Sequence, residues 1–187
     1  MPVERCCRGV DALSEALVAM KPNEARLDID AVFRVQYARI VRVIMRVIRD
    51  HARAEELAVE VFLKWSRDRK AQRENAEGWL YRIAVRTGLN ELRRQMRQER
   101  YERLASLVRR SPTPEEVFAA REEQERVRKI LNAMERRQAE LLVLRSDGLT
   151  YEELAVALKL NPVSVGTLLS RAQQAFRKEY MKRYGPQ

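Results

Sequence analysis

The sequence has few of the residues that tight turns need. It holds six glycines and six prolines among 187 residues, about half of the roughly 12% that these two residues make up in typical globular chains. A β-sheet protein with many tight turns needs more of both. Because 45% of the residues are hydrophobic, the chain can still bury a core, so the composition argues against wholesale disorder and predicts a helical protein.

Cysteine and histidine are nearly absent as well. The two cysteines, Cys6 and Cys7, are adjacent, which is a poor arrangement for stapling a secreted fold. With His51 as the single histidine and no C-x-x-C pair, the sequence predicts no zinc or other metal site, no cofactor and no Ser-His-Asp triad. A glycine-rich phosphate loop is also missing. We therefore do not expect an enzyme.

Long apolar runs are missing too. No run approaches the ~18 residues that a membrane-spanning helix requires. Residues 1–20 mix acidic with apolar side chains and contain no signal-peptide core. The sequence therefore predicts a cytoplasmic protein that does not associate with a membrane.

Basic residues are abundant but unevenly placed. The chain has 37 Lys and Arg against 27 Asp and Glu, a net charge of +10, which favours an anionic partner such as nucleic acid. Residues 24–101 and 126–187 each carry a net charge of +6, whereas residues 102–125 carry −2 and include two prolines in Ser111–Pro114. Since prolines stop helices, we expect two domains and a flexible linker. The expected divisions are a leader (1–23), a first domain (24–101), the linker (102–114) and a second domain (115–187).

Apolar residues at helical spacing define the first domain. One helix follows from the spacing between Phe33 and Ile48, and a second from the stripe of Leu57, Val61, Phe62 and Trp65. The segment Ser66–Glu77 is polar and has no period, so we expect a loop there. A third helix buries Trp79, Leu80, Ile83, Ala84, Leu92 and Met96, and its polar side carries Arg82, Arg86, Asn90, Arg93, Arg94 and Arg97.

The second domain contains a helix-turn-helix pattern. Helices are expected from Pro114 to Met134 and from Arg136 to Ser146. Thr150 with Glu153 forms a capping box for a short helix, and Asn161-Pro162 begins the next one. Lys159 stands where the motif usually has glycine, which costs about 1 kcal/mol in a left-handed conformation. The small Ala155 suits a helix crossing, although an ordinary helical hairpin is an alternative for this stretch.

The two halves together resemble an extracytoplasmic-function sigma factor of bacterial RNA polymerase. Three stretches carry the resemblance, in the family's order and spacing. They are the acidic-apolar segment Ala54–Trp65, the segment Gly78–Ala84 followed by Asn90 and Arg93-Arg94, and the helix-turn-helix from Gly148 to Ala172. Roughly residues 24–100 and 115–183 are covered. The resemblance implies an all-α protein with two small helical domains, called region two and region four.

The resemblance also implies the function and the partners. A sigma factor directs core RNA polymerase to specific promoters and aids promoter melting in transcription initiation, so the partners are promoter DNA and the clamp helices of the largest polymerase subunit. Members of the family are often held inactive by an anti-sigma factor, and nothing in the sequence identifies one. A cationic channel and a base pocket suit single-stranded DNA.

The implied site residues fall into three groups. Region two reads the minus-ten element with Arg67, Arg69, Lys70, Arg73, Asn75, Arg82, Arg86, Asn90, Arg93, Arg94 and Arg97. Region four reads the minus-thirty-five element with Asn161, Ser164, Thr167, Ser170, Arg171, Arg177 and Lys178. The polymerase is bound by Glu55, Glu56, Leu57, Val59, Glu60 and Lys64.

The sequence departs from the family pattern at several of these positions. Val59 replaces a glutamine amide on the polymerase-binding segment, and Arg86 and Asn90 replace the family's Asn and Asp. Gly166 and Leu168 lie where the recognition helix usually carries Lys and Arg, so minus-thirty-five binding is expected to rely on fewer charges.

The alternative function is a helix-turn-helix regulator that binds duplex DNA without polymerase docking. Such a regulator explains residues 148–178 but gives no role to the polar segment and the acidic helix of the first domain. A membrane-surface helix at Ile40–Arg49 and a pure scaffold are weaker alternatives.

Overall fold

The computed structural model describes residues 29–73, 75–105 and 118–185, and the regular structure within these ranges is entirely helical. This confirms the predicted all-α class. The predicted leader (1–23) and the proline-containing segment Ser111–Pro114 lie outside the described residues. The first bundle consists of α2 (Ile29–Met45), α3 (His51–Arg67), α4 (Arg69–Arg73) and α5 (Ala76–Ala105), and the second bundle of α6 (Phe118–Ala133), α7 (Arg136–Ser146), α8 (Tyr151–Leu158) and α9 (Pro162–Tyr184).

The first bundle packs α2, α3 and α5 around one apolar core. The predicted apolar faces are confirmed, because Ile40, Ile44 and Trp65 have no exposed surface. Phe33 packs against this core, and its ring meets that of Phe62 edge-on with the centroids 4.8 Å apart. Burial of large side chains of this kind, each contributing roughly 1.5–3 kcal/mol, holds the three helices together.

The segment Ser66–Glu77, predicted as a loop, is partly helical. α3 continues to Arg67, and α4 begins two residues later. Asp68 Oδ1 accepts hydrogen bonds from the backbone N–H groups of Lys70 and Ala71 at 2.9 and 3.1 Å, which caps α4. Ala71 is buried against the bundle. A five-residue helix is too short to show a helical period, which is why the sequence pattern did not reveal it.

α5 is longer than the sequence pattern indicated. It has 30 residues, about 45 Å at 1.5 Å per residue, and it ends at Ala105, past the expected domain boundary at residue 101. The expected helix start at Pro114 lies outside the described residues, and α6 is described from Phe118.

The local signals in the helix-turn-helix are confirmed. Thr150 and Glu153 form the predicted capping box at the start of α8, with the Thr150 N–H donating to Glu153 Oε2 at 2.6 Å. Lys159 ends α8 in the left-handed conformation at a φ of 52°. Asn161 then caps α9, and Pro162 occupies its first turn. The cost of a lysine in this conformation is offset by the backbone hydrogen bonds that it allows at the end of α8.

The far end of α9 packs back onto α6. Tyr180 donates a hydrogen bond to Glu123 at 3.2 Å, and the Arg126 guanidinium lies over the ring of Tyr184 at 5.3 Å. Phe176, Tyr180 and Tyr184 also form a ladder of neighbouring rings along α9. These contacts join the first and last helices of the second bundle.

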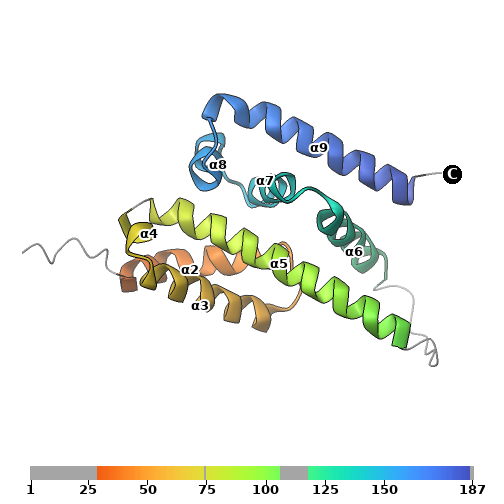
Figure 1. Cartoon of the computed structure of the whole chain (residues 1–187), viewed down its shortest axis with the longest axis horizontal. Helices are drawn as coiled ribbons and strands as arrows, with labels where there is room; N and C mark the ends of the chain where they lie inside the picture. The colour runs from red at the N-terminus through yellow and green to blue at the C-terminus, as the bar shows by residue number, and fades with distance from the viewer. Residues whose placement is uncertain (1–28, 74, 106–117, 186–187) are drawn as a thin grey trace, which may run out of the picture.

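The two bundles lie against each other. Figure 1 shows α5 running between the α2–α3 pair and the helices α6, α7 and α8, with α9 on the outer side of the second bundle. Within the described ranges, no helix is both long and apolar enough to cross a membrane.

Candidate nucleic-acid interface

The arginines of α5 were expected on a solvent face, but Arg82 is buried. Its side chain lies between the bundles and donates a hydrogen bond to the Ala157 carbonyl of α8 at 3.2 Å. One turn earlier, at Gly78, α8 approaches α5 so closely that a Cβ added to this glycine would lie 2.9 Å from Val156 Cγ1. The packing of α8 on the start of α5 removes Arg82 from the surface. In this arrangement Arg82 is not on the exposed side of α5, and its role in minus-ten binding stays a prediction.

Arg86 is engaged by a carboxylate of the second bundle. Glu140 on α7 is almost fully buried, and its Oε1 accepts from Arg86 Nε at 3.0 Å and from Arg136 Nε at 3.2 Å. A buried carboxylate needs such partners, since an unpaired charge in this position costs several kcal/mol. Sequence reasoning missed Glu140, because nothing in its local pattern shows which arginine it meets.

A second carboxylate bridges the bundles at the end of α7. The side chain of Asp147 is 3% exposed, and its Oδ1 lies 3.6 Å from the Nε atoms of both Arg42 and Arg46 on α2. Together with the contacts of Gly78, Arg82 and Arg86, this ion-pair cluster forms what we call the inter-bundle contact. The second bundle thus places its buried carboxylates against arginines of the first.

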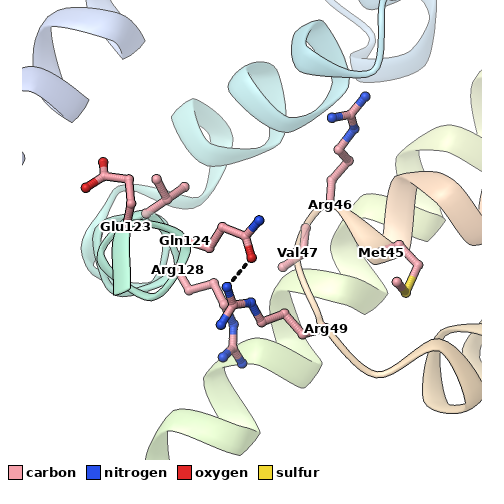
Figure 2. Close-up of a pocket in the computed structure, with 8 residues that line it drawn as sticks. Met45, Arg46, Val47, Arg49, Glu123, Gln124 and Arg128 are labelled. Atoms are coloured by element: carbon pink, nitrogen blue, oxygen red, sulfur yellow. Dashed lines mark hydrogen bonds between the residues drawn. The ribbon is translucent and has the colours of Figure 1, made fainter. Parts of the chain in front are cut away.

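A cleft of about 710 Å³ lies beside the inter-bundle contact, between α6 and the end of α2. Figure 2 shows Arg49 hydrogen-bonded to Gln124 across this cleft, with Arg128 beside them. Arg128 also donates to Gln95 of α5 at 2.9 Å. These polar bridges extend the inter-bundle contact toward the far end of α5.

Other expected minus-ten residues remain accessible. Asn90 is exposed, Arg93 is half-buried, and Asn75 caps α5 by accepting from the Gly78 N–H at 2.9 Å. The Arg73 side chain lies outside the described set. The exposed cations among the expected minus-ten residues are Arg67, Arg69, Lys70, Arg94 and Arg97.

Arg94 is exposed but not independent. Its Nε and NH2 donate to the two oxygens of Glu91 at 3.0 and 2.6 Å, and Arg53 of α3 donates to the same carboxylate at 3.3 Å. These hydrogen bonds lower the pKa of Glu91 to about 2, against a desolvation effect that acts in the opposite direction. Glu91 thus ties the start of α3 to α5.

The expected polymerase-binding residues divide between two faces of α3. Leu57 is buried in the core, so it supports the helix and is not available to a partner. Val59 is 41% exposed, and Leu63, which the sequence reasoning missed, is 48% exposed. Acidic and basic side chains surround this apolar pair on the same outward side; they are Glu55, Glu56, Glu60 and Lys64.

The α9 helix presents one continuous exposed face. Residues at positions 163, 167, 170, 171, 174, 177 and 178 project to the same side at 100° per residue, and all are exposed. Val165, Leu169 and Ala172 are buried on the opposite side. We call the exposed set the α9 stripe; its members are Val163, Thr167, Ser170, Arg171, Gln174, Arg177 and Lys178.

Two expected minus-thirty-five residues serve the helix start. Asn161 Oδ1 accepts from the Val163 N–H at 3.0 Å, and the Ser164 hydroxyl donates to the Asn161 carbonyl at 2.8 Å. Ser164 is also half-buried and lies off the α9 stripe. Thr167, Ser170, Arg171, Arg177 and Lys178 lie on the stripe as a group.

Comparisons with known proteins give two family matches in chain order. The family described as Sigma-70 region 2 matches residues 32–98, and the family described as Sigma-70, region 4 matches residues 124–175. Among solved structures, the chain is similar to the sigma factor RpoE in complex with the anti-sigma factor NepR from Bartonella quintana. That match has 20% identity and a TM-score of 0.47, and covers 81% of this chain and 96% of that chain. No curated protein matches the sequence.

Proposed function

Since the chain belongs to the sigma-70 family, as an extracytoplasmic-function sigma factor, we propose that its two bundles divide promoter recognition between them. A sigma factor binds core RNA polymerase and promoter DNA and directs initiation to specific promoters. Under this proposal the polymerase supplies the chemistry, this chain supplies none, and the protein acts in the cytoplasm. We assign residues 24–101 to region two, 102–114 to the linker and 115–187 to region four, and note that α5 of region two continues to Ala105, within the assigned linker.

The first bundle would read and help to melt the minus-ten element. The exposed cations of α4 and α5 are available to contact the phosphates of a single strand. Arg82 and Arg86 join this set only when the second bundle moves away, because α7 and α8 now hold them.

The outward face of α3 would dock on the clamp helices of the largest polymerase subunit. The observation that supports this role is the exposed pair Val59 and Leu63, framed by Glu56, Glu60 and Lys64. An apolar centre with a charged rim is the usual composition of a protein–protein interface. Leu57 contributes from the inside, by holding the helix in place.

The second bundle would read the minus-thirty-five element with the α9 stripe. Its cations, Arg171, Arg177 and Lys178, lie toward the middle and the C-terminal half of the helix. Residues near the start of a recognition helix contact base edges, and later cations contact phosphates. Gly166 places no charge beside the groove, in keeping with binding through few charges.

The bundles must separate for both elements to be read at once. The elements are centred about 25 base pairs apart, which is about 85 Å of duplex at 3.4 Å per base pair. A compact chain of this length has a radius of gyration of only about 16 Å. Engagement of the whole promoter therefore requires that the inter-bundle contact opens.

Run-off transcription and core-polymerase pull-down test the proposal with the full chain. Val59→Glu adds a charge to the docking face, and we expect it to abolish core binding and promoter-specific transcripts while leaving the fold intact. Val35→Glu is the matched control, because Val35 is 68% exposed and belongs to α2, not to the docking helix. Equal core binding by the two variants would overturn the docking assignment. Upstream duplex binding by the unmodified chain without any core binding would favour the regulator that acts alone.

A further inference from the structure

The start of the α9 stripe carries an apolar side chain with no packing role. Val163 is 90% exposed, more than any other large hydrophobic residue among those described as exposed. It directly follows Pro162 at the beginning of α9, opposite the buried Val165 and Leu169. A valine in water at this position stabilises neither the bundle core nor the inter-bundle contact.

The polar neighbours of Val163 are already engaged. Asn161 and Ser164 make the capping hydrogen bonds described above, which orient them toward the helix backbone. Val163 and Thr167 lie one helical turn apart on the stripe, about 6 Å along the axis. Val163 ends in two methyl groups and Thr167 in one methyl group and a hydroxyl, so the leading end of the stripe offers apolar contacts and no charge.

The charge distribution along the stripe supports a division between bases and phosphates. The first cation, Arg171, lies eight residues after Val163, and Arg177 and Lys178 lie further along. Cations contribute affinity through phosphates without reading sequence. The uncharged leading end is therefore the part of the stripe that can discriminate between bases.

We propose that Val163 is a specificity-determining residue that contacts the C5-methyl group of a thymine in the minus-thirty-five element. In the major groove, thymine is the only standard base that presents a methyl group, and apolar side chains recognise it by direct contact. This inference rests on the proposed function of α9. It adds a residue that the sequence did not single out and the kind of base that it reads.

The test begins with selection of the preferred upstream element. Holoenzyme assembled from the full chain and core polymerase selects from duplexes randomised upstream of a fixed minus-ten element. Each thymine enriched in the upstream element is then replaced singly by uracil, which removes only the methyl group. For the contacted thymine we expect about a fourfold loss of affinity, the value of one buried methyl-sized group.

Two variants test whether Val163 is the side chain responsible for this loss of affinity. Val163→Ala should bind the thymine duplex about fourfold more weakly than the unmodified chain, and should no longer distinguish thymine from uracil. Val35→Ala is the matched control, since Val35 is another exposed valine, on α2 of the first bundle, and it should keep the full discrimination. Both variants should melt like the unmodified chain when followed by circular dichroism.

The outcomes separate this inference from the proposed function. Selection of an upstream element without thymine, or uracil sensitivity that persists in Val163→Ala, overturns the role of Val163 and leaves the function of α9 intact. Initiation with no upstream element enriched at all overturns the assignment of α9 to this element, and the role of Val163 with it.

Discussion

The two bundles carry the same basic excess and use it differently. Residues 24–101 and 126–187 each have a net charge of +6. In the first bundle Arg42, Arg46 and Arg86 are paired with buried carboxylates of the second bundle. On the α9 stripe the three cations are exposed, and none is paired with a carboxylate in the described part of the chain. Net charge thus measures attraction for DNA, whereas packing decides which cations DNA can reach.

The largest effect on access to the cations of the first bundle is expected from a substitution at Gly78. A leucine here would drive its side chain into Val156 and the α8 backbone, since the first added atom already lies 2.9 Å from Val156. We expect Gly78→Leu to separate the bundles and to raise affinity for a single-stranded minus-ten oligonucleotide by about tenfold to a hundredfold, the usual range of coupling between sites. Small-angle X-ray scattering measures the separation, and fluorescence anisotropy the affinity.

Gly166→Ala is the matched control for Gly78→Leu. Gly166 is also a helical glycine, but among the described residues an added Cβ would meet the Tyr151 ring alone, at an ordinary 3.5 Å. It should leave the compactness of the chain unchanged and stabilise α9 by about 1 kcal/mol. If Gly78→Leu remained as compact as this control, the inter-bundle contact would not limit access to α5.

Acid should weaken the first bundle through Glu91. The folded-state pKa of Glu91 is about 2, below its ordinary value of 4.5. The stabilisation is therefore fully present above about pH 4.5 and is lost as the pH falls toward 2. We expect Glu91→Gln to lower the free energy of unfolding by on the order of 2 kcal/mol at pH 7, less than the full shift implies, because Arg94 is exposed.

Urea denaturation from pH 7 to pH 2.5 measures this difference. The gap between Glu91→Gln and the unmodified chain should narrow steadily below pH 4.5. Glu179→Gln is the control in the second bundle, where Glu179 forms an ion pair with the exposed Arg183, and it should cost less than about 0.5 kcal/mol. A gap independent of pH would show that Glu91 acts by shape and not by charge.

The smallest expected effect concerns the salt dependence of DNA binding, which should differ between the cations of α9 and those of α5. Arg177→Ala with Lys178→Ala should reduce the slope of log affinity against log salt concentration by close to two for the upstream duplex. Between 50 and 200 mM salt, the affinity of this double variant should therefore fall by about tenfold less than that of the unmodified chain. Arg93→Ala with Arg97→Ala should leave this slope unchanged and reduce the slope for single-stranded DNA by about 1.4. Equal effects of both pairs on both ligands would contradict the division between bundles. Arg94 is left intact, because its removal would also disturb Glu91.

Local rules predicted more of this molecule than long-range ones could. The Thr150 capping box, the left-handed Lys159 and the apolar helix faces depend on neighbours within a few residues, and all three are confirmed. The burial of Arg82 and the pairing of Glu140 depend on which segments meet after folding, which no single-chain pattern reveals. Leu57 is a different case, since its own stripe already indicated the core. Its assignment to the polymerase-binding residues came from the resemblance to the family.

The aromatic contacts between α6 and α9 have a mechanical consequence. Tyr180 and Tyr184 of α9 contact Glu123 and Arg126 of α6, the first helix of the second bundle. These contacts hold the first helix of the second bundle to the end of its recognition helix, so we expect α6 and α9 to move together when the second bundle separates from the first.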